Sequence, residues 1–194
     1  MSDIAPGLAD PTHGSQRLFR AILEAFAHPG SIVGLPQPPA GVDRLSPAAA
    51  AFLLTLVDRD TPLWLEPGLY TDAVQSFVRF HTGAPIVTSK ADALFAVLTP
   101  EGTPTINGFA IGTDTYPDRS ATLLFDLPSL GGGPLRRIRG PGINGSTSIA
   151  VPGLPESFWS EWAANRALFP CGVDLVLAAG TDLLALPRSI LLEG

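Results

Sequence analysis

The 194-residue sequence contains very little cysteine or histidine. Cys171 is the single cysteine, so an intrachain disulfide is excluded, and a reducing compartment such as the cytoplasm suits the chain best. The three histidines show no metal-ligand spacing, so we expect no zinc site. Cys171 has no sequence hint of a partner base, and we interpret it as a small buried apolar residue.

Lysine is also scarce, because Lys90 stands alone beside eleven arginines. A pyridoxal phosphate (PLP) Schiff base would have to form on this one residue. The segment around it, Thr88 to Asp92, is typical of a solvated helix start, so we expect no PLP cofactor. The dominance of arginine suits bidentate recognition of anions, although codon bias would give the same composition.

Positive charge and long apolar runs are both lacking. Twelve basic residues face eighteen acidic ones, and the resulting net charge of −6 argues against nucleic acid or an anionic membrane as a partner. The longest apolar run, Ala48 to Leu54, is too short to cross a bilayer, and the first twenty residues contain no signal-peptide run. The hydrophobic fraction of 45% is that of a globular protein. We therefore expect a cytoplasmic protein.

The stretch Arg79–Pro85 has the clearest local pattern. A helix is predicted to start at Tyr70 or Thr71 and to end before Gly83, which suits a left-handed C-cap. Helical spacing places His81 on the apolar face and Arg79 on the polar edge. Two interpretations remain open, namely a core histidine beside cations that favour the helix dipole, or an anion or hydrogen-bonding site at the helix end.

Hydrophobic periodicity and turn residues predict the other elements. Residues 1–14 are expected to form an extended lead-in, and the ordered chain is expected to close at Arg188. Further helices are predicted at 15–27, 46–57 and 154–168, and strands at 31–35, 62–66, 93–99, 121–127, 135–139, 173–178 and 183–186. Buried apolar strands that alternate with amphipathic helices favour one α/β domain over 15–194, with a mixed sheet sandwiched between helices.

The segment Gly140–Gly145 matches the G-x-G-x-x-G pattern, but no helix is expected to follow it, so a dinucleotide site is not indicated. The amides of Gly140 and Gly142 beside Arg139 could hold phosphate oxygens. The alternative is a structural turn next to a solvated basic strand. The sequence contains neither a P-loop nor a G-x-S-x-G nucleophile motif, and these residue patterns alone predict no reaction.

Several segments, in this order along residues 7–189, are similar to one known family. They are Gly7–Pro11, Gln16–Leu23, Pro29-Gly30, Asp58-x-x-Thr61-Pro62-x-Trp64-Leu65, Arg79–Pro85, Ala121–Leu123, Gly140–Ile143, Phe169-Pro170-x-Gly172-x-Asp174-Leu175 and Leu186–Ser189. No single motif is diagnostic, but the ordered set resembles the H subunit family (PhnH) of the bacterial carbon–phosphorus lyase system.

The resemblance implies a role in phosphonate catabolism. Subunits G, H, I and L of that system make α-D-ribose 1-methylphosphonate 5-triphosphate from ATP and methylphosphonate, with the nucleoside chemistry attributed to subunit I. The family's H subunit is implied to be an accessory member of a G/H/I/J assembly and a homodimer in isolation. Its fold is implied to be similar to PLP-dependent transferases without the cofactor lysine.

These observations give three hypotheses, namely an accessory subunit, a subunit with its own nucleotide or phosphonate site, and a degenerate PLP-type transferase. No catalytic or metal residue is assigned. We expect two stretches to meet at one corner. One stretch contains Asp58 and Thr61, and the other runs from Arg79 to Thr82. The candidate residues for a subunit interface or an anionic ligand are Asp58, Thr61, Arg79, His81, Thr82, Arg139, Gly140, Gly142 and Arg188.

Overall fold

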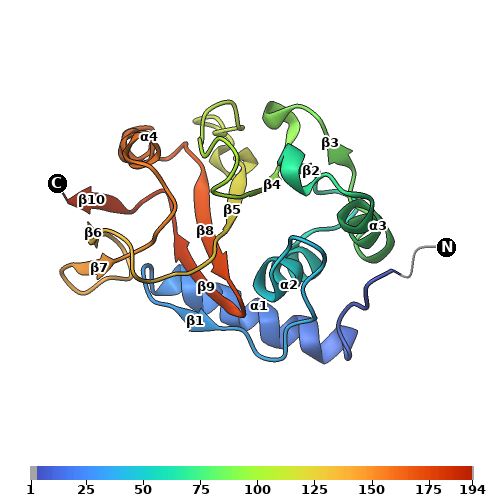
Figure 1. Ribbon diagram of the computed structural model, residues 1–194. Coiled ribbons are helices and arrows are strands. Elements are labelled where there is room, and N and C mark those ends of the chain that lie inside the picture. The colour runs from blue at the N-terminus through green and yellow to red at the C-terminus, as the bar shows by residue number, and fades with distance from the viewer. Residues whose placement is uncertain (1–3, 194) are drawn as a thin grey trace.

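The computed structural model describes residues 4–193, and a seven-stranded sheet forms its centre (Figure 1). The strand order is β1-β9-β8-β5-β4-β2-β3, in which the strands from β8 to β3 run parallel and β9 pairs antiparallel with both β8 and β1. The strands are β1 (Val33–Gly34), β2 (Leu63–Leu65), β3 (Ile86–Val87), β4 (Phe95–Leu98), β5 (Thr122–Asp126), β8 (Asp174–Ala179) and β9 (Asp182–Leu186).

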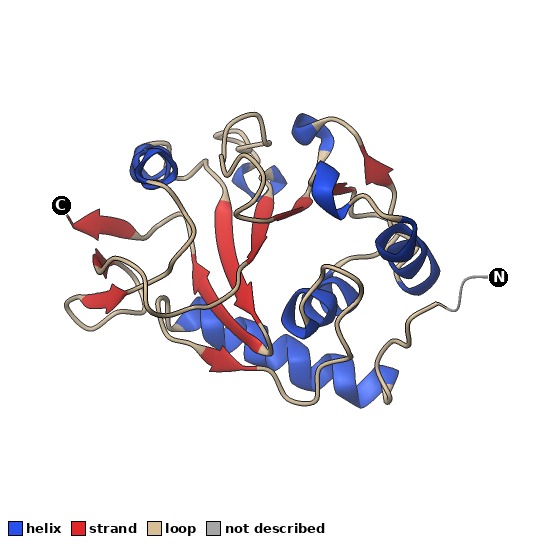
Figure 2. Cartoon of the chain, viewed as in Figure 1, coloured by secondary structure: helices blue, strands red, loops and turns tan. Residues whose placement is uncertain are grey.

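Three helices pack on one face of this sheet, and these are α1 (Pro11–Ala27), α2 (Pro47–Leu56) and α3 (Asp72–His81). The opposite face is covered by α4 (Glu156–Arg166) and by a second antiparallel sheet. That sheet has the order β10-β6-β7 and consists of β6 (Arg136–Arg139), β7 (Thr147–Ile149) and β10 (Leu191–Glu193). Figure 2 shows the large sheet between these two layers.

The alternation of side chains along the central strands creates two separate cores. On β8, Val176 and Ala178 face the α1–α3 layer, whereas Leu175 and Leu177 face the layer that contains α4. All four residues are essentially buried, as expected for a parallel strand that is covered on both faces. The mixed α/β sheet predicted from the sequence is therefore confirmed.

Local signals account for the helix ends. The Ser46 hydroxyl accepts a hydrogen bond from Ala49 N, and Pro47 occupies the first turn of α2. The Thr71 hydroxyl caps α3 in the same way by accepting from Val74 N. Gly83 follows α3 with a φ of 70°, so the predicted left-handed glycine at this helix end is confirmed.

Three expectations need correction. Residues 11–14 belong to α1 rather than to an extended lead-in, because Asp10 accepts from His13 N as the N-cap and Pro11 begins the helix. The chain stays ordered beyond Arg188, since β10 pairs with β6. One face of the sheet is covered by α4 together with the small sheet rather than by helices alone. No helix within residues 4–193 combines the length and the apolar character that a membrane span requires.

Candidate functional site

The two stretches that were expected to form one corner adjoin through the strands that follow them, but no hydrogen bond within residues 4–193 joins Asp58 or Thr61 to the segment Arg79–Thr82. They meet where β2 and β3 begin, because Leu63 N donates to Pro85 O (2.9 Å) and the two strands pair in parallel. In the turn before β2, the Thr61 hydroxyl accepts from Asp58 N (2.6 Å) and lies 3.1 Å from Asp58 Oδ1. These polar groups therefore bond mainly to each other.

At the end of α3, His81 and Thr82 have partners within the chain. The distance from His81 Nε2 to Ala5 O is 2.9 Å, and the imidazole packs against the Phe77 ring at 4.8 Å between centroids. The Thr82 hydroxyl donates to Val78 O (2.7 Å), which is a typical helix-end contact. Arg79, by contrast, is exposed to solvent. This geometry agrees with a structural role for His81 and leaves Arg79 free to meet a partner.

The Gly-Pro-Gly turn lies against the rest of the chain. Gly142 has a φ of 83°, and a Cβ there would be 2.3 Å from Ala27 O at the end of α1. Gly140 is close to Ser189 and Ile190, just before β10. The guanidinium of Arg139 is exposed and lies 3.6 Å from a carboxylate oxygen of Glu193. Both glycines therefore have a packing role, and Arg139 lies beside a carboxylate.

Arg188 is held inside the protein. Its backbone N and its Nε both donate to Asp174 Oδ1 (2.8 and 3.1 Å), and Nη2 pairs with Asp174 Oδ2. Nη1 donates to Pro117 O (2.8 Å). The guanidinium group is already occupied by a carboxylate and a carbonyl. We therefore assign Arg188 a structural role, in which it holds the first residue of β8 in place.

A cleft that the sequence reasoning missed lies at the carboxyl edge of the parallel strands. It has a volume of about 510 Å³, and none of the nine candidate residues from the sequence lines it. In open α/β sheets, ligands bind outside the carboxyl ends of the strands. The lining residues are Asp43, Arg44, Leu45, Ser46, Gly68, Leu69, Thr99, Glu101, Asp126, Leu127 and Pro128.

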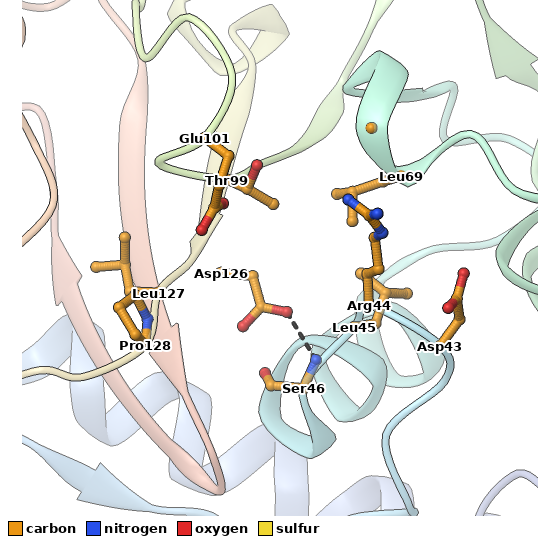
Figure 3. A pocket seen from close by; sticks show the side chains of 11 residues that line it. Asp43, Arg44, Leu45, Ser46, Leu69, Thr99, Glu101, Asp126, Leu127 and Pro128 are labelled. Carbon is orange, nitrogen blue, oxygen red and sulfur yellow. Dashed lines mark hydrogen bonds between the residues drawn. The ribbon is translucent and has the colours of Figure 1, made fainter.

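Asp126 is the last residue of β5 and points into this cleft (Figure 3). The residue is 8% exposed, and its Oδ2 accepts from Ser46 N (2.7 Å) at the start of α2. The side chain of Ser46 also interacts with this carboxyl. Burial raises the pKa of the Asp126 carboxyl above its ordinary value of 3.8, even though the Ser46 hydrogen bond opposes this effect.

A neighbouring lobe of the cleft, also about 510 Å³, extends toward the end of β2. Glu66 follows β2 directly, is 5% exposed, and accepts from both the backbone N and the hydroxyl of Thr99 (2.7 and 2.6 Å). The two lobes share Arg44, Gly68, Thr99 and Glu101. Lys90 lines the second lobe with its ammonium 5.1 Å from the centroid of the Trp64 ring, a cation–π contact.

The raised pKa of Asp126 predicts a measurable pH dependence. The folded state holds this proton to a higher pH than the unfolded state, so the free energy of unfolding falls as pH rises from 3.8 through the folded pKa. Asp126→Asn removes this contribution while an amide oxygen can still accept from Ser46 N. Urea unfolding at about pH 4 and about pH 7 should show the variant gaining stability relative to the wild type at the higher pH. If the variant and the wild type differed in free energy of unfolding by the same amount at both pH values, the assigned direction of the pKa shift would be contradicted.

The comparisons with known proteins place the chain in a family. The model of the bacterial phosphonate metabolism protein family (PhnH) matches residues 6–193. The chain belongs to the PhnH family. This finding confirms the resemblance that the ordered motifs indicated.

Two relatives support the assignment to the PhnH family. The subunit PhnH of alpha-D-ribose 1-methylphosphonate 5-triphosphate synthase from Rhizobium meliloti (strain 1021) is 44% identical over 186 residues, which cover 95% of this chain and 93% of that protein. The putative C-P lyase subunit protein HtxG of Stutzerimonas stutzeri is 31% identical over 179 residues, or 90% and 83% of the two chains. Neither name refers to a PLP enzyme, so the expected likeness to PLP-dependent transferases gains no support from these relatives.

Proposed function

We propose that this protein is an accessory subunit of a carbon–phosphorus lyase system. In this role it supports the synthesis of α-D-ribose 1-methylphosphonate 5-triphosphate from ATP and methylphosphonate. The observation that carries the proposal is the PhnH family match over residues 6–193, together with 44% identity to a subunit of the synthase that makes this compound.

We further propose that the chain acts as one domain in the cytoplasm, without a catalytic centre of its own. Its partners are subunits G, I, J and L of the same system, and in isolation it forms a homodimer. Exposed side chains support a role in assembly. Arg79 is exposed, and the apolar side chain of Phe80 beside it is 69% exposed and remains available for contact.

The proposed function requires no PLP. Lys90 lies in a short 3-10 turn at Lys90–Asp92, and its ammonium is placed over the rings of Trp64 and Phe109 at 5.1 and 5.0 Å. A Schiff base on Lys90 would have to displace its ammonium from these two cation–π contacts. A visible absorbance band after incubation with PLP, abolished in Lys90→Arg, would contradict this part of the proposal.

The predicted corner offers a direct test of the role in assembly. Arg79 is exposed, and Phe80 beside it is among the most exposed large apolar residues in residues 4–193. Arginine and large aromatic side chains are the residues most often found at interface hot spots. We expect Arg79→Ala combined with Phe80→Ala to reduce copurification of the co-expressed partner subunits by about tenfold or more.

A matched control is Leu135→Ala, because Leu135 is 79% exposed and directly precedes β6, a strand that lies far from α3 (Figure 1). Circular dichroism and thermal unfolding should show that both variants are folded. The proposal predicts that only the α3 double variant loses partner subunits. If the double variant recovered as much of the partner subunits as the wild type, this corner would not be part of the interface.

The alternative, that this subunit carries a nucleotide or phosphonate site at the Gly-Pro-Gly turn, is less favoured. The turn packs against the end of α1, and Arg139 lies beside Glu193. A degenerate PLP-type transferase is the weakest alternative, because Lys90 is already engaged by two aromatic rings.

A further inference from the structure

We propose that the carboxyl-edge cleft binds an uncharged, hydroxyl-bearing ring compound of nucleoside size, which donates hydrogen bonds to Asp126 and Glu101. This inference does not rest on the role as an accessory subunit, because the cleft belongs to this chain alone. It concerns binding and assigns no reaction.

The first argument is the acceptor capacity of Asp126. The residue is 8% exposed, and its Oδ2 accepts from Ser46 N (2.7 Å). The side chain faces the cleft (Figure 3), and a carboxylate has more lone pairs than the contacts with Ser46 use. A bound hydroxyl group that donates to this carboxylate would offset part of its desolvation.

The second argument is charge. Asp43, Glu101 and Asp126 line the first lobe against a single guanidinium, that of Arg44. Three carboxylates would repel a triphosphate, because the like charges would interact in a partly desolvated cleft. An uncharged ligand avoids this repulsion. Hydroxyl groups also match both sides of the cleft, since they donate to carboxylates and accept from Arg44.

The third argument is size and shape. Each lobe has a volume of about 510 Å³, within the usual range for sites that hold small organic molecules. The second lobe contains Trp64, whose indole is edge-on to Phe109 at 5.5 Å between centroids. Trp64 in one lobe, with the Lys90 ammonium over its indole ring, and acceptors in the other lobe fit a compound with a ring and a hydroxylated part.

The test uses the full chain and isothermal titration calorimetry with three probes, namely adenosine, its dideoxy analogue without the two ribose ring hydroxyls, and ATP. We expect adenosine to bind, the dideoxy analogue to bind about tenfold more weakly or not at all, and ATP to bind more weakly than adenosine. Absence of adenosine binding, equal binding of the dideoxy analogue, or tighter binding of ATP would each overturn the proposal.

Variants tie the binding to the cleft. Asp126→Asn and Glu101→Gln should each weaken adenosine binding about tenfold, because an amide is a poorer acceptor than a carboxylate. Glu101 is exposed, so Glu101→Gln should fold even if Asp126→Asn does not. The control is Asp118→Asn, an exposed carboxylate outside the cleft, which should leave the affinity unchanged. The assignment would be contradicted if Glu101→Gln and Asp126→Asn each left the affinity for adenosine unchanged. It would also be contradicted if Asp118→Asn weakened adenosine binding as much as they do.

Discussion

Arg188→Ala is expected to lower the free energy of unfolding by about 3 kcal/mol. The side chains of Arg188 and Asp174 are only 15% and 19% exposed, and the guanidinium contacts both carboxylate oxygens as well as Pro117 O. Removing the arginine leaves a mostly buried carboxylate without its counter-charge. Urea denaturation measures this loss. The dependence of the free energy of unfolding on urea concentration (the m value) should stay unchanged.

Arg139→Ala is the matched control, because this arginine is 59% exposed and its ion pair with Glu193 is long at 3.6 Å. It should change stability by less than about 0.5 kcal/mol. The double variant Asp174→Ala with Arg188→Ala should lose less free energy of unfolding than the two single variants lose in sum. A loss for Arg188→Ala as small as the one expected for Arg139→Ala would show that Arg188 is not a structural residue.

Gly142→Ala is expected to lower the free energy of unfolding by about 3 kcal/mol or more. The residue has a φ of 83°, which disfavours any side chain, and the new Cβ would approach Ala27 O to 2.3 Å and Pro29 Cδ to 2.7 Å. A backbone carbonyl cannot rotate away as a side chain can. The end of α1 or the turn itself would therefore have to shift, and thermal unfolding should report the loss.

Gly145→Ala separates backbone strain from steric overlap. Gly145 has a similar φ of 76°, but no heavy atom lies within 4 Å of a Cβ built there. Only the strain of the left-handed conformation remains, and it costs about 1–2 kcal/mol. If Gly145→Ala were as damaging as Gly142→Ala, the close contact between the Gly-Pro-Gly turn and α1 would not be what makes Gly142 necessary.

Much of the fold could be predicted from local patterns. The limits of α2 and α3 follow from Ser46, Pro47 and Thr71, which act within one turn of the chain. The same logic applies to Asp10 and Pro11, which are an N-cap and a first-turn proline. They were interpreted as part of an extended lead-in because aspartate and proline are also turn residues, whereas in the structure the Asp10 side chain caps α1 by accepting from His13 N.

Elements that depend on distant partners were harder to predict. β7 and β10 have three residues each, and they are ordered because they pair with the two edges of β6. The contact of His81 with Ala5 joins residues 76 positions apart. No local pattern encodes such pairs.

The cleft was missed for a related reason. Its key polar residues, Glu66, Thr99 and Asp126, come at or directly after the ends of apolar strands, which is a visible sequence signal. They converge only because β2, β4 and β5 are neighbours and run parallel, so their carboxyl ends share one edge. The sequence reasoning did not establish that strand order.

The most direct test of the proposed role is a reconstituted assay with purified subunits G, I and L, ATP and methylphosphonate, run with and without this chain. The account predicts no turnover by this chain alone, and a loss of product when it is omitted from the mixture. Product formation from ATP and methylphosphonate by this chain in isolation would contradict the account.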